Sequence, residues 1–234
     1  MLGAIMYFLI WTPLQLARLL WWNWKIDGKR NLPPPGQGVV LAINHMNWTD
    51  IHILGASLPL SHRPWWIAKI EMFLNPLVTW WLKQMQVIPI KRGKRDSAAM
   101  DAAESALRGG GALIIFPEGH RSRTGGLLEG RGGAIRLAAR MGCPIVPIAI
   151  WGTESGLRGA ALRKPIHVRI GEPYYVPLKD GKVRWDRLDD LSEEMMLRIA
   201  ELMPEQYWGF YREPMLRRAS GDASLRAAGP AARG

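Results

Sequence analysis

Cysteine is nearly absent from the 234 residues of this chain, and the sequence patterns of several well-known chemistries are missing. The single Cys143 excludes an internal disulfide and fits a reducing compartment. The sequence has no Gly-x-Ser-x-Gly elbow, no nucleotide-binding glycine loop, no metal-ligand spacing of His and Cys, and no RNP-like motif. We therefore expect no elbow-type serine hydrolase, no metal ion, no organic cofactor and no nucleic-acid partner.

Tryptophan and positive charge, by contrast, are abundant. Most of the twelve tryptophans lie in the first third of the chain. The indole ring favours the membrane–water interface, although a Trp-rich soluble core is the plainer interpretation. Lysine and arginine number 31 against 20 acidic residues, which gives a net charge of +11. This excess indicates an anionic partner, such as lipid head groups or a phosphorylated substrate.

The first 24 residues are largely apolar, but they lack the basic start and the cleavage site of a signal peptide. Pro13, Gln15 and Arg18 interrupt the apolar run. Thr12 and Pro13 have the character of an N-cap and a first helical position, so we expect two short helices that lie in one leaflet. A single kinked transmembrane helix is the alternative.

Beyond the stiff linker "NLPPPGQG", short apolar stretches alternate with helical patterns. This alternation predicts an α/β fold with a mostly parallel central sheet covered by helices. We expect three parts: membrane-interfacial helices over 1–30, a catalytic domain over 31–212, and a basic, disordered tail over 213–234. Strands are expected at 38–44, 63–70, 86–92, 111–116, 144–152 and 164–173, and helices at 49–58, 75–85, 97–110, 130–142 and 187–206. Cys143 lies in the apolar stretch before the fifth of these strands and is expected in the core.

His45 and Asp50 stand five residues apart in "NHMNWTD", directly after an apolar strand. Functional groups of open α/β sheets gather at the carboxyl ends of strands. Asp50 falls in the first turn of the next helix, where the helix dipole favours its ionised form. It can then accept the Nδ1–H of His45 and leave Nε2 free to take a proton. Two ordinary polar loop residues remain the alternative, because this spacing alone is a weak motif.

Basic groups follow other strands in the same way. In "FPEGHRSRTGG", Glu118 and Arg121 flank Gly119, and Arg121 and Arg123 can fork onto phosphate oxygens. The alternative is a basic surface loop.

Basic residues also lie at the ends of two more predicted strands. "VIPIKR" carries Lys91 and Arg92 into a loop, and "WWIAKI" ends near Lys69. These groups predict a second clamp for phosphate or a lipid head group, with a solvated charge run as the alternative.

The order of "NHMNWTD", "VIPIKR", "FPEGHRS" and "PIVPIAI" resembles the four sequence blocks of the glycerolipid acyltransferases. The resemblance is closest to the bacterial 1-acyl-sn-glycerol-3-phosphate (lysophosphatidate) acyltransferases and covers roughly residues 30–175. "AKIEMF" is similar to the family's Ala-Lys-x-Glu-Leu-Phe, with Met72 where leucine is usual. His120 replaces the threonine of Phe-Pro-Glu-Gly-Thr-Arg-Ser, which bears on head-group preference.

The resemblance implies an O-acyltransferase in which His45 is the general base and Asp50 orients it. It implies transfer of a fatty acyl group from acyl-CoA or acyl-carrier protein to the sn-2 hydroxyl of 1-acyl-sn-glycerol-3-phosphate, which forms phosphatidate in phospholipid biosynthesis. The acceptor-binding residues that it implies are Lys69, Lys91, Arg92, Glu118, Gly119 and Arg121.

The acceptor and product of such a reaction are membrane lipids, so we expect the enzyme at the cytoplasmic face of the cell membrane. Three alternatives remain. The enzyme acts on another acceptor, such as glycerol-3-phosphate, another lysophospholipid or a lyso-aminolipid. It is a membrane-bound thioesterase, or it is a peripheral membrane protein without activity.

Overall fold

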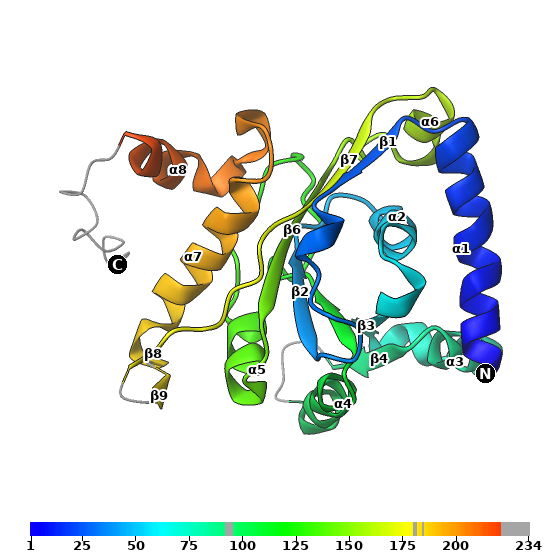
Figure 1. Ribbon diagram of the computed structural model, residues 1–234, viewed down its shortest axis with the longest axis horizontal. Coiled ribbons are helices and arrows are strands. Elements are labelled where there is room, and N and C mark those ends of the chain that lie inside the picture. The colour runs from blue at the N-terminus through cyan, green and yellow to red at the C-terminus, as the bar shows by residue number, and fades with distance from the viewer. Residues whose placement is uncertain (92–95, 180–181, 184, 221–234) are drawn as a thin grey trace.

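The computed structural model describes residues 1–91, 96–179, 182–183 and 185–220, and its centre is a seven-stranded sheet (Figure 1). The strand order is β1-β7-β6-β2-β5-β3-β4, and the β6–β7 pair alone is antiparallel. The predicted mostly parallel α/β sheet is therefore confirmed. The strands are β1 (Trp24–Asp27), β2 (Val39–Ile43), β3 (Pro64–Lys69), β4 (Val87–Ile90), β5 (Ala112–Ile115), β6 (Ile145–Trp151) and β7 (Ile166–Ile170), with a separate hairpin of β8 (Leu178–Lys179) and β9 (Lys182–Val183).

Helices cover both faces of the sheet (Figure 1). The central strand β2 shows how the pleat divides the core. Val40 and Ala42 pack with α4, α5 and α7 on one face. Val39, Leu41 and Ile43 pack with α2 on the other face. The helices are α1 (Leu2–Leu20), α2 (Asp50–Ser57), α3 (Pro76–Gln84), α4 (Ser97–Arg108), α5 (Gly133–Met141), α6 (Gly156–Ala161), α7 (Leu188–Ala200) and α8 (Arg212–Ala219).

The N-terminal segment forms one continuous helix, so the prediction of two helices separated at Pro13 is wrong. Pro13 lies inside α1, where its missing N–H leaves the carbonyl of Leu9 without the usual helical donor. The Thr12 hydroxyl donates to the carbonyl of Phe8 at 2.8 Å rather than capping a new helix. Tertiary contacts outweigh the local preference of a Thr-Pro pair, because packing supplies most of the stability of a helix in a protein.

Those contacts join the inner face of α1 to the C-terminus of α2. The Tyr7 hydroxyl, the Trp11 indole and the Gln15 amide donate hydrogen bonds to carbonyls there. The acceptors are Gly55 at 2.7 Å, Ala56, and Leu58 at 3.1 Å. The last carbonyls of a helix have no partner within the helix, so α1 supplies donors that α2 lacks.

The outer face of α1 carries exposed apolar side chains at helical spacing, namely Ile5, Leu9, Leu16 and Leu20. Among the residues that the structure describes, α1 alone has the length and mean hydropathy (1.3) of a helix that can cross a membrane. Its docking along α2 nevertheless makes it part of the folded domain, at the end of the molecule opposite α8 (Figure 1).

Trp24–Asp27 forms an edge strand, although the sequence placed residues 1–30 in the membrane-binding segment. This strand, β1, pairs in parallel with β7. Gly28, with φ +80°, follows it directly, and a Cβ there would lie 2.0 Å from the carbonyl oxygen of Ile170. The central sheet therefore begins before the expected boundary at residue 30.

The expected disordered tail over 213–234 begins too early, because α8 covers its first residues. Arg218 pairs there with Glu194 at 2.6 Å and with Glu201 at 2.7 Å. Arg218, within the predicted tail, thus binds back onto α7 and the residue that follows it. The remainder of that prediction, 221–234, lies outside the described residues.

Candidate active site

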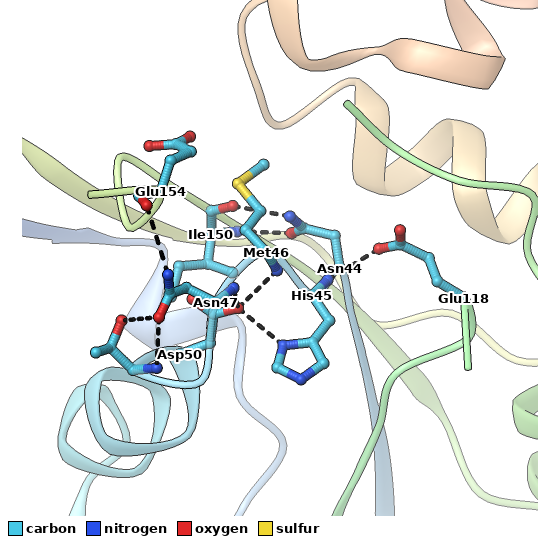
Figure 2. A network of polar contacts seen from close by, with 9 residues as sticks. Asn44, His45, Met46, Asn47, Asp50, Glu118, Ile150 and Glu154 are labelled. Carbon is cyan, nitrogen blue, oxygen red and sulfur yellow. Dashed lines mark hydrogen bonds and ion pairs between the residues drawn. The ribbon is translucent and has the colours of Figure 1, made fainter. Parts of the chain in front are cut away.

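His45 follows β2 directly and pairs with Asp50, the first residue of α2 (Figure 2). Its Nδ1 lies 2.9 Å from Oδ2 of Asp50. The Asp50 side chain is completely buried, whereas the imidazole is 14% exposed. The ring stacks on Phe116 with 4.2 Å between centroids, which holds one face of the imidazole against the residue that follows β5. The contact expected from the sequence is present, and the Nε2 of His45 has no hydrogen-bond partner among the described residues.

The carboxylate of Asp50 organises the whole turn. Its Oδ2 also accepts hydrogen bonds from the backbone N–H groups of Met46 at 2.7 Å and Asn47 at 2.8 Å. Asn47 in turn accepts the N–H of Thr49 at 3.2 Å. The two backbone hydrogen bonds keep the Asp50 carboxylate from rotating freely. The fixed carboxylate in turn orients the imidazole of His45 through its third hydrogen bond.

Asn44 fixes the turn to the centre of the sheet. Its side-chain amide donates to the carbonyl of Ile150 and accepts the N–H of the same residue, both at 2.8 Å. These bonds extend the pairing of β2 and β6 by one residue beyond the strand end. The backbone that carries His45 is therefore rigid on both sides.

Glu118 lies on the other side of His45 from Asp50 (Figure 2). One carboxylate oxygen accepts the backbone N–H of His45 at 2.9 Å, and the other accepts that of Leu128 at 3.0 Å. Only 1% of this residue is exposed. Burial raises the pKa of the Glu118 carboxyl to about 7, although the two backbone hydrogen bonds act to lower it. Glu118 thus joins two loops and does not reach the surface of the cleft, although the resemblance implied that it binds the acceptor.

His45 opens into a cleft of about 2060 Å³ at this edge of the sheet. The cleft is strongly basic, because among the described residues seven lysines and arginines line it against two acidic residues, Asp96 and Glu154. The cationic residues are Lys69, Lys91, Arg121, Arg123, Arg131, Arg136 and Arg140. The N–H of Ser122 donates to the carbonyl of His45 at 2.8 Å, which places the loop of Arg121 and Arg123 beside the imidazole.

Five of the predicted site residues therefore share one cleft: His45, Lys69, Lys91, Gly119 and Arg121. Asp50 and Glu118 lie beneath its surface and hold His45 by hydrogen bonds. Gly119 adopts φ +76°, a backbone conformation that suits glycine. Arg92 lies outside the described residues.

Comparison with known proteins shows the family of this chain. The family model described as Acyltransferase matches residues 23–151, more than half of the chain, including His45, Asp50 and the Glu118 loop. The chain belongs to the acyltransferase family.

Curated relatives within this family carry more specific names. BAT2, a chloroplastic 1-acyl-sn-glycerol-3-phosphate acyltransferase of Brassica napus, is 32% identical over 76% of this chain and 50% of its own length. The 1-acyl-sn-glycerol-3-phosphate acyltransferase of Bacillus subtilis is 29% identical over 76% of this chain and 87% of its own. A lyso-ornithine lipid O-acyltransferase of Pseudomonas aeruginosa is 30% identical over 64% and 59%. The chain spans about half the length of the plant relatives that it matches.

The acyltransferase fold extends beyond the matched segment. The crystal structure of the 1-acyl-sn-glycerophosphate (LPA) acyltransferase PlsC from Thermotoga maritima aligns with 96% of this chain and 81% of its own, with a TM-score of 0.58 and 23% identity. This likeness shows a common fold that includes the segments before residue 23 and after residue 151.

The acyltransferase cleft also contains residues that sequence reasoning missed. Arg131 and Arg136 line it, and Phe116 supports the imidazole. Arg136 and Arg140 are four residues apart on the polar face of α5, which from sequence looks like any solvated helix surface. Phe116 gave a usable signal, since it begins the recognised Phe-Pro-Glu-Gly stretch, but its contact with His45 depends on the pairing of β2 with β5.

Proposed function

We propose that this acyltransferase transfers a fatty acyl group from a thioester to the sn-2 hydroxyl of 1-acyl-sn-glycerol-3-phosphate and so forms phosphatidate. The observation that carries the proposal is the His45–Asp50 pair at the floor of a basic cleft. The names of the relatives from Brassica and Bacillus support the same acceptor.

The chemistry follows from the orientation of the imidazole. Asp50 accepts the Nδ1–H of His45, so the unprotonated Nε2 can remove the proton of the acceptor hydroxyl. The acceptor oxygen then attacks the thioester carbonyl to form a tetrahedral intermediate. This intermediate collapses with loss of the thiolate, which takes the proton from the imidazolium. Asp50 stabilises the imidazolium while it exists.

The acceptor phosphate fits the basic groups nearest to His45. Arg121 and Arg123 belong to the loop that bonds to the His45 carbonyl, and Lys69 and Lys91 line the same cleft. Arginine binds phosphate through two parallel hydrogen bonds, and lysine acts as a point charge. The acceptor head group is therefore anchored by charge while its hydroxyl reaches Nε2.

Membrane association follows from the nature of the acceptor and from the apolar outer face of α1. Exposed Leu74, Leu77 and Trp81 in and before α3 extend that face near the N-terminus of α1. We propose that this surface rests on the cytoplasmic leaflet of the cell membrane, with acyl-CoA or acyl-carrier protein as donor and without a metal or cofactor.

The test is an acyl-transfer assay with the purified full chain on phospholipid vesicles. Oleoyl-CoA is offered with lysophosphatidate, 1-acylglycerol, lyso-ornithine lipid or glycerol-3-phosphate. We expect lysophosphatidate to be preferred, because only the phosphorylated lipids engage the Arg121 loop. His45→Ala and Asp50→Asn should each lower kcat by about 10²- to 10⁴-fold, since both remove the oriented base.

Exposed Arg217 in α8 provides a matched control for these variants, and Arg217→Gln should leave turnover unchanged. Preference for 1-acylglycerol or for the lyso-ornithine lipid would refute the phosphate clamp. Hydrolysis of oleoyl-CoA without acceptor, at the full rate of transfer, would identify a thioesterase instead.

A further inference from the structure

An exposed tryptophan lines the same cleft as His45. Trp185 lines the cleft and is 48% exposed. The guanidinium of Arg136 lies over its ring, with Cζ 5.8 Å from the centroid. Leu188, three residues later, packs against Gly132 beside α5. The indole is thus held next to α5 by its neighbours, while half of its surface remains free for a ligand.

Arg131 and Arg136 line the same cleft as this tryptophan. The N–H of Arg131 donates to the carbonyl of Pro117 at 3.0 Å, and its guanidinium lies beside Gly119. Arg136 follows within α5. Neither forms a salt bridge with any residue in the described part of the chain, whereas Arg140 pairs with Glu104 at 2.9 Å. Two guanidinium groups without a salt bridge to the described residues therefore line the cleft, one beside Gly119 and one over Trp185.

The size of the cleft calls for a second ligand. Pockets for one small ligand measure about 300–1,000 Å³, and this cleft has about 2060 Å³. The acceptor phosphate uses the cations beside His45, which leaves Arg131, Arg136 and Trp185 without a ligand in the proposed reaction.

We propose that acyl-CoA is the donor and that Arg131, Arg136 and Trp185 bind its nucleotide end. This inference rests on the proposed acyl transfer and names its second substrate. The adenine base stacks on the free surface of Trp185, because every base presents a π-face to an aromatic side chain. The diphosphate and the 3′-phosphate bind the two free guanidinium groups. The pantetheine arm then follows the cleft to place the thioester at His45.

A carrier protein fits these features less well. It presents a protein surface, which needs an extended basic patch on the outside of the enzyme. A half-exposed indole within a concave cleft, flanked by guanidinium groups, instead suits a planar base attached to phosphates. Between the two donors, the geometry favours the nucleotide.

The experiment measures binding of the nucleotide apart from catalysis. Free CoA, 3′-dephospho-CoA and phosphopantetheine are titrated into the purified full chain by calorimetry, for the wild type, Arg136→Gln and Trp185→Ala. We expect Trp185→Ala to weaken CoA binding by roughly fivefold or more, the loss that corresponds to one base stack, and Arg136→Gln to weaken it by a similar factor through the lost phosphate contact. Phosphopantetheine, which lacks the base, should bind the wild type and Trp185→Ala equally.

Arg187→Gln is the matched control, because Arg187 is exposed close to Trp185, pairs with Asp190 at 2.6 Å and does not line the cleft. It should bind CoA as the wild type does. In acyl-transfer assays, Arg136→Gln and Trp185→Ala should raise KM for oleoyl-CoA without changing kcat or KM for lysophosphatidate. This split separates a binding role from a loss of folding.

Unchanged CoA binding in both variants would overturn the inference. So would an equal loss of phosphopantetheine binding, or transfer from acyl-carrier protein by a wild-type enzyme that does not bind CoA. In the last case the proposed acyl transfer stands and the nucleotide site fails. If CoA binds as expected but no acceptor is acylated, the proposed function fails instead.

Discussion

At the scale of single residues, two buried carboxylates hold one histidine from two directions. Asp50 bonds to the imidazole, and Glu118 bonds to the backbone of the same residue. The two groups do different work, because the first orients the base and the second fixes the loop of Leu128 to the end of β2. Glu118 is therefore a positioning residue for the loop that we propose binds the acceptor phosphate.

Glu118 makes the stability of the fold depend on pH. Burial raises the pKa of its carboxyl from 4.5 to about 7. The folded state then holds a proton that the unfolded chain has released, so this stabilising contribution is complete below pH 4.5 and is lost as the pH rises through 7. In Glu118→Gln the site no longer titrates. We expect the wild-type minus variant difference in the free energy of unfolding to fall by up to roughly 3 kcal/mol across this range, as measured by urea denaturation at a series of pH values.

The control for this measurement is Glu129→Gln, which removes an exposed carboxylate from the same loop. Its difference from the wild type should be flat with pH. A flat difference for Glu118→Gln as well would show that the Glu118 carboxyl titrates normally in the folded protein.

At the scale of elements, α1 is amphipathic in a particular sense. Its inner face is partly polar, and Tyr7 and Gln15 are buried there as donors to α2. Its outer face is apolar and exposed. This arrangement reverses the usual pattern of a surface helix, and it is the pattern expected where the outer solvent is lipid.

Replacing two leucines of the outer face should detach the protein from vesicles. Leu9 and Leu16 are 64% and 52% exposed, so Leu9→Glu with Leu16→Glu removes apolar contact with lipid without opening the core. We expect at least a tenfold loss in vesicle co-sedimentation, from the lost burial and the charges introduced. Leu216→Glu in α8, at the opposite end of the molecule, is the control and should sediment normally. Equal sedimentation of all variants would show that α1 does not contact the bilayer.

The elements that the sequence predicted well are those in which local and tertiary preferences agree. The apolar strands β2 to β7 and the helices α2 to α5 follow the alternation of the sequence closely, whereas α6 was not predicted. Pro13 was misinterpreted because the contacts of α1 with α2 outweigh its local effect. The strand β1 was missed because "WKID" is short and follows a Trp-rich run, and only its pairing with β7 defines it.

The residues of the site also differ in how far the sequence could predict their contacts. The His45–Asp50 contact spans one turn directly after a strand, so the spacing together with its position at the strand end predicted it. The direction of the Glu118 side chain depends on a loop that closes ten residues later, at Leu128. The role of Arg136 depends on Trp185, which is 49 positions away and belongs to another element. Neither could be read from residue type alone.

At the scale of the whole molecule, charge and apolar surface are arranged for a lipid substrate. The net charge is +11, and the described lining of the cleft is strongly cationic. The helices α1 and α3, which both carry exposed apolar side chains, lie at one end of the molecule (Figure 1). The membrane attachment that we propose thus combines attraction to an anionic bilayer by charge with apolar contact through α1 and α3.

This division predicts how binding responds to salt. Raising the ionic strength from about 0.1 M to about 1 M shortens the Debye length from about 10 Å to about 3 Å. We expect binding to anionic vesicles to fall over this range to the level seen with zwitterionic vesicles, which should itself change little. Flotation of vesicles at several salt concentrations measures both. Salt-independent binding to anionic vesicles would contradict the electrostatic part of this account.

The hydrogen bonds between α1 and α2 couple attachment to turnover. The helix α2 has eight residues, and its first residue, Asp50, orients the imidazole of His45. The C-terminal end of the same helix accepts hydrogen bonds from α1. We therefore expect a chain trimmed of its first twenty residues to have a lower kcat, even in detergent or on a soluble substrate, because α1 no longer donates hydrogen bonds to the helix that carries Asp50.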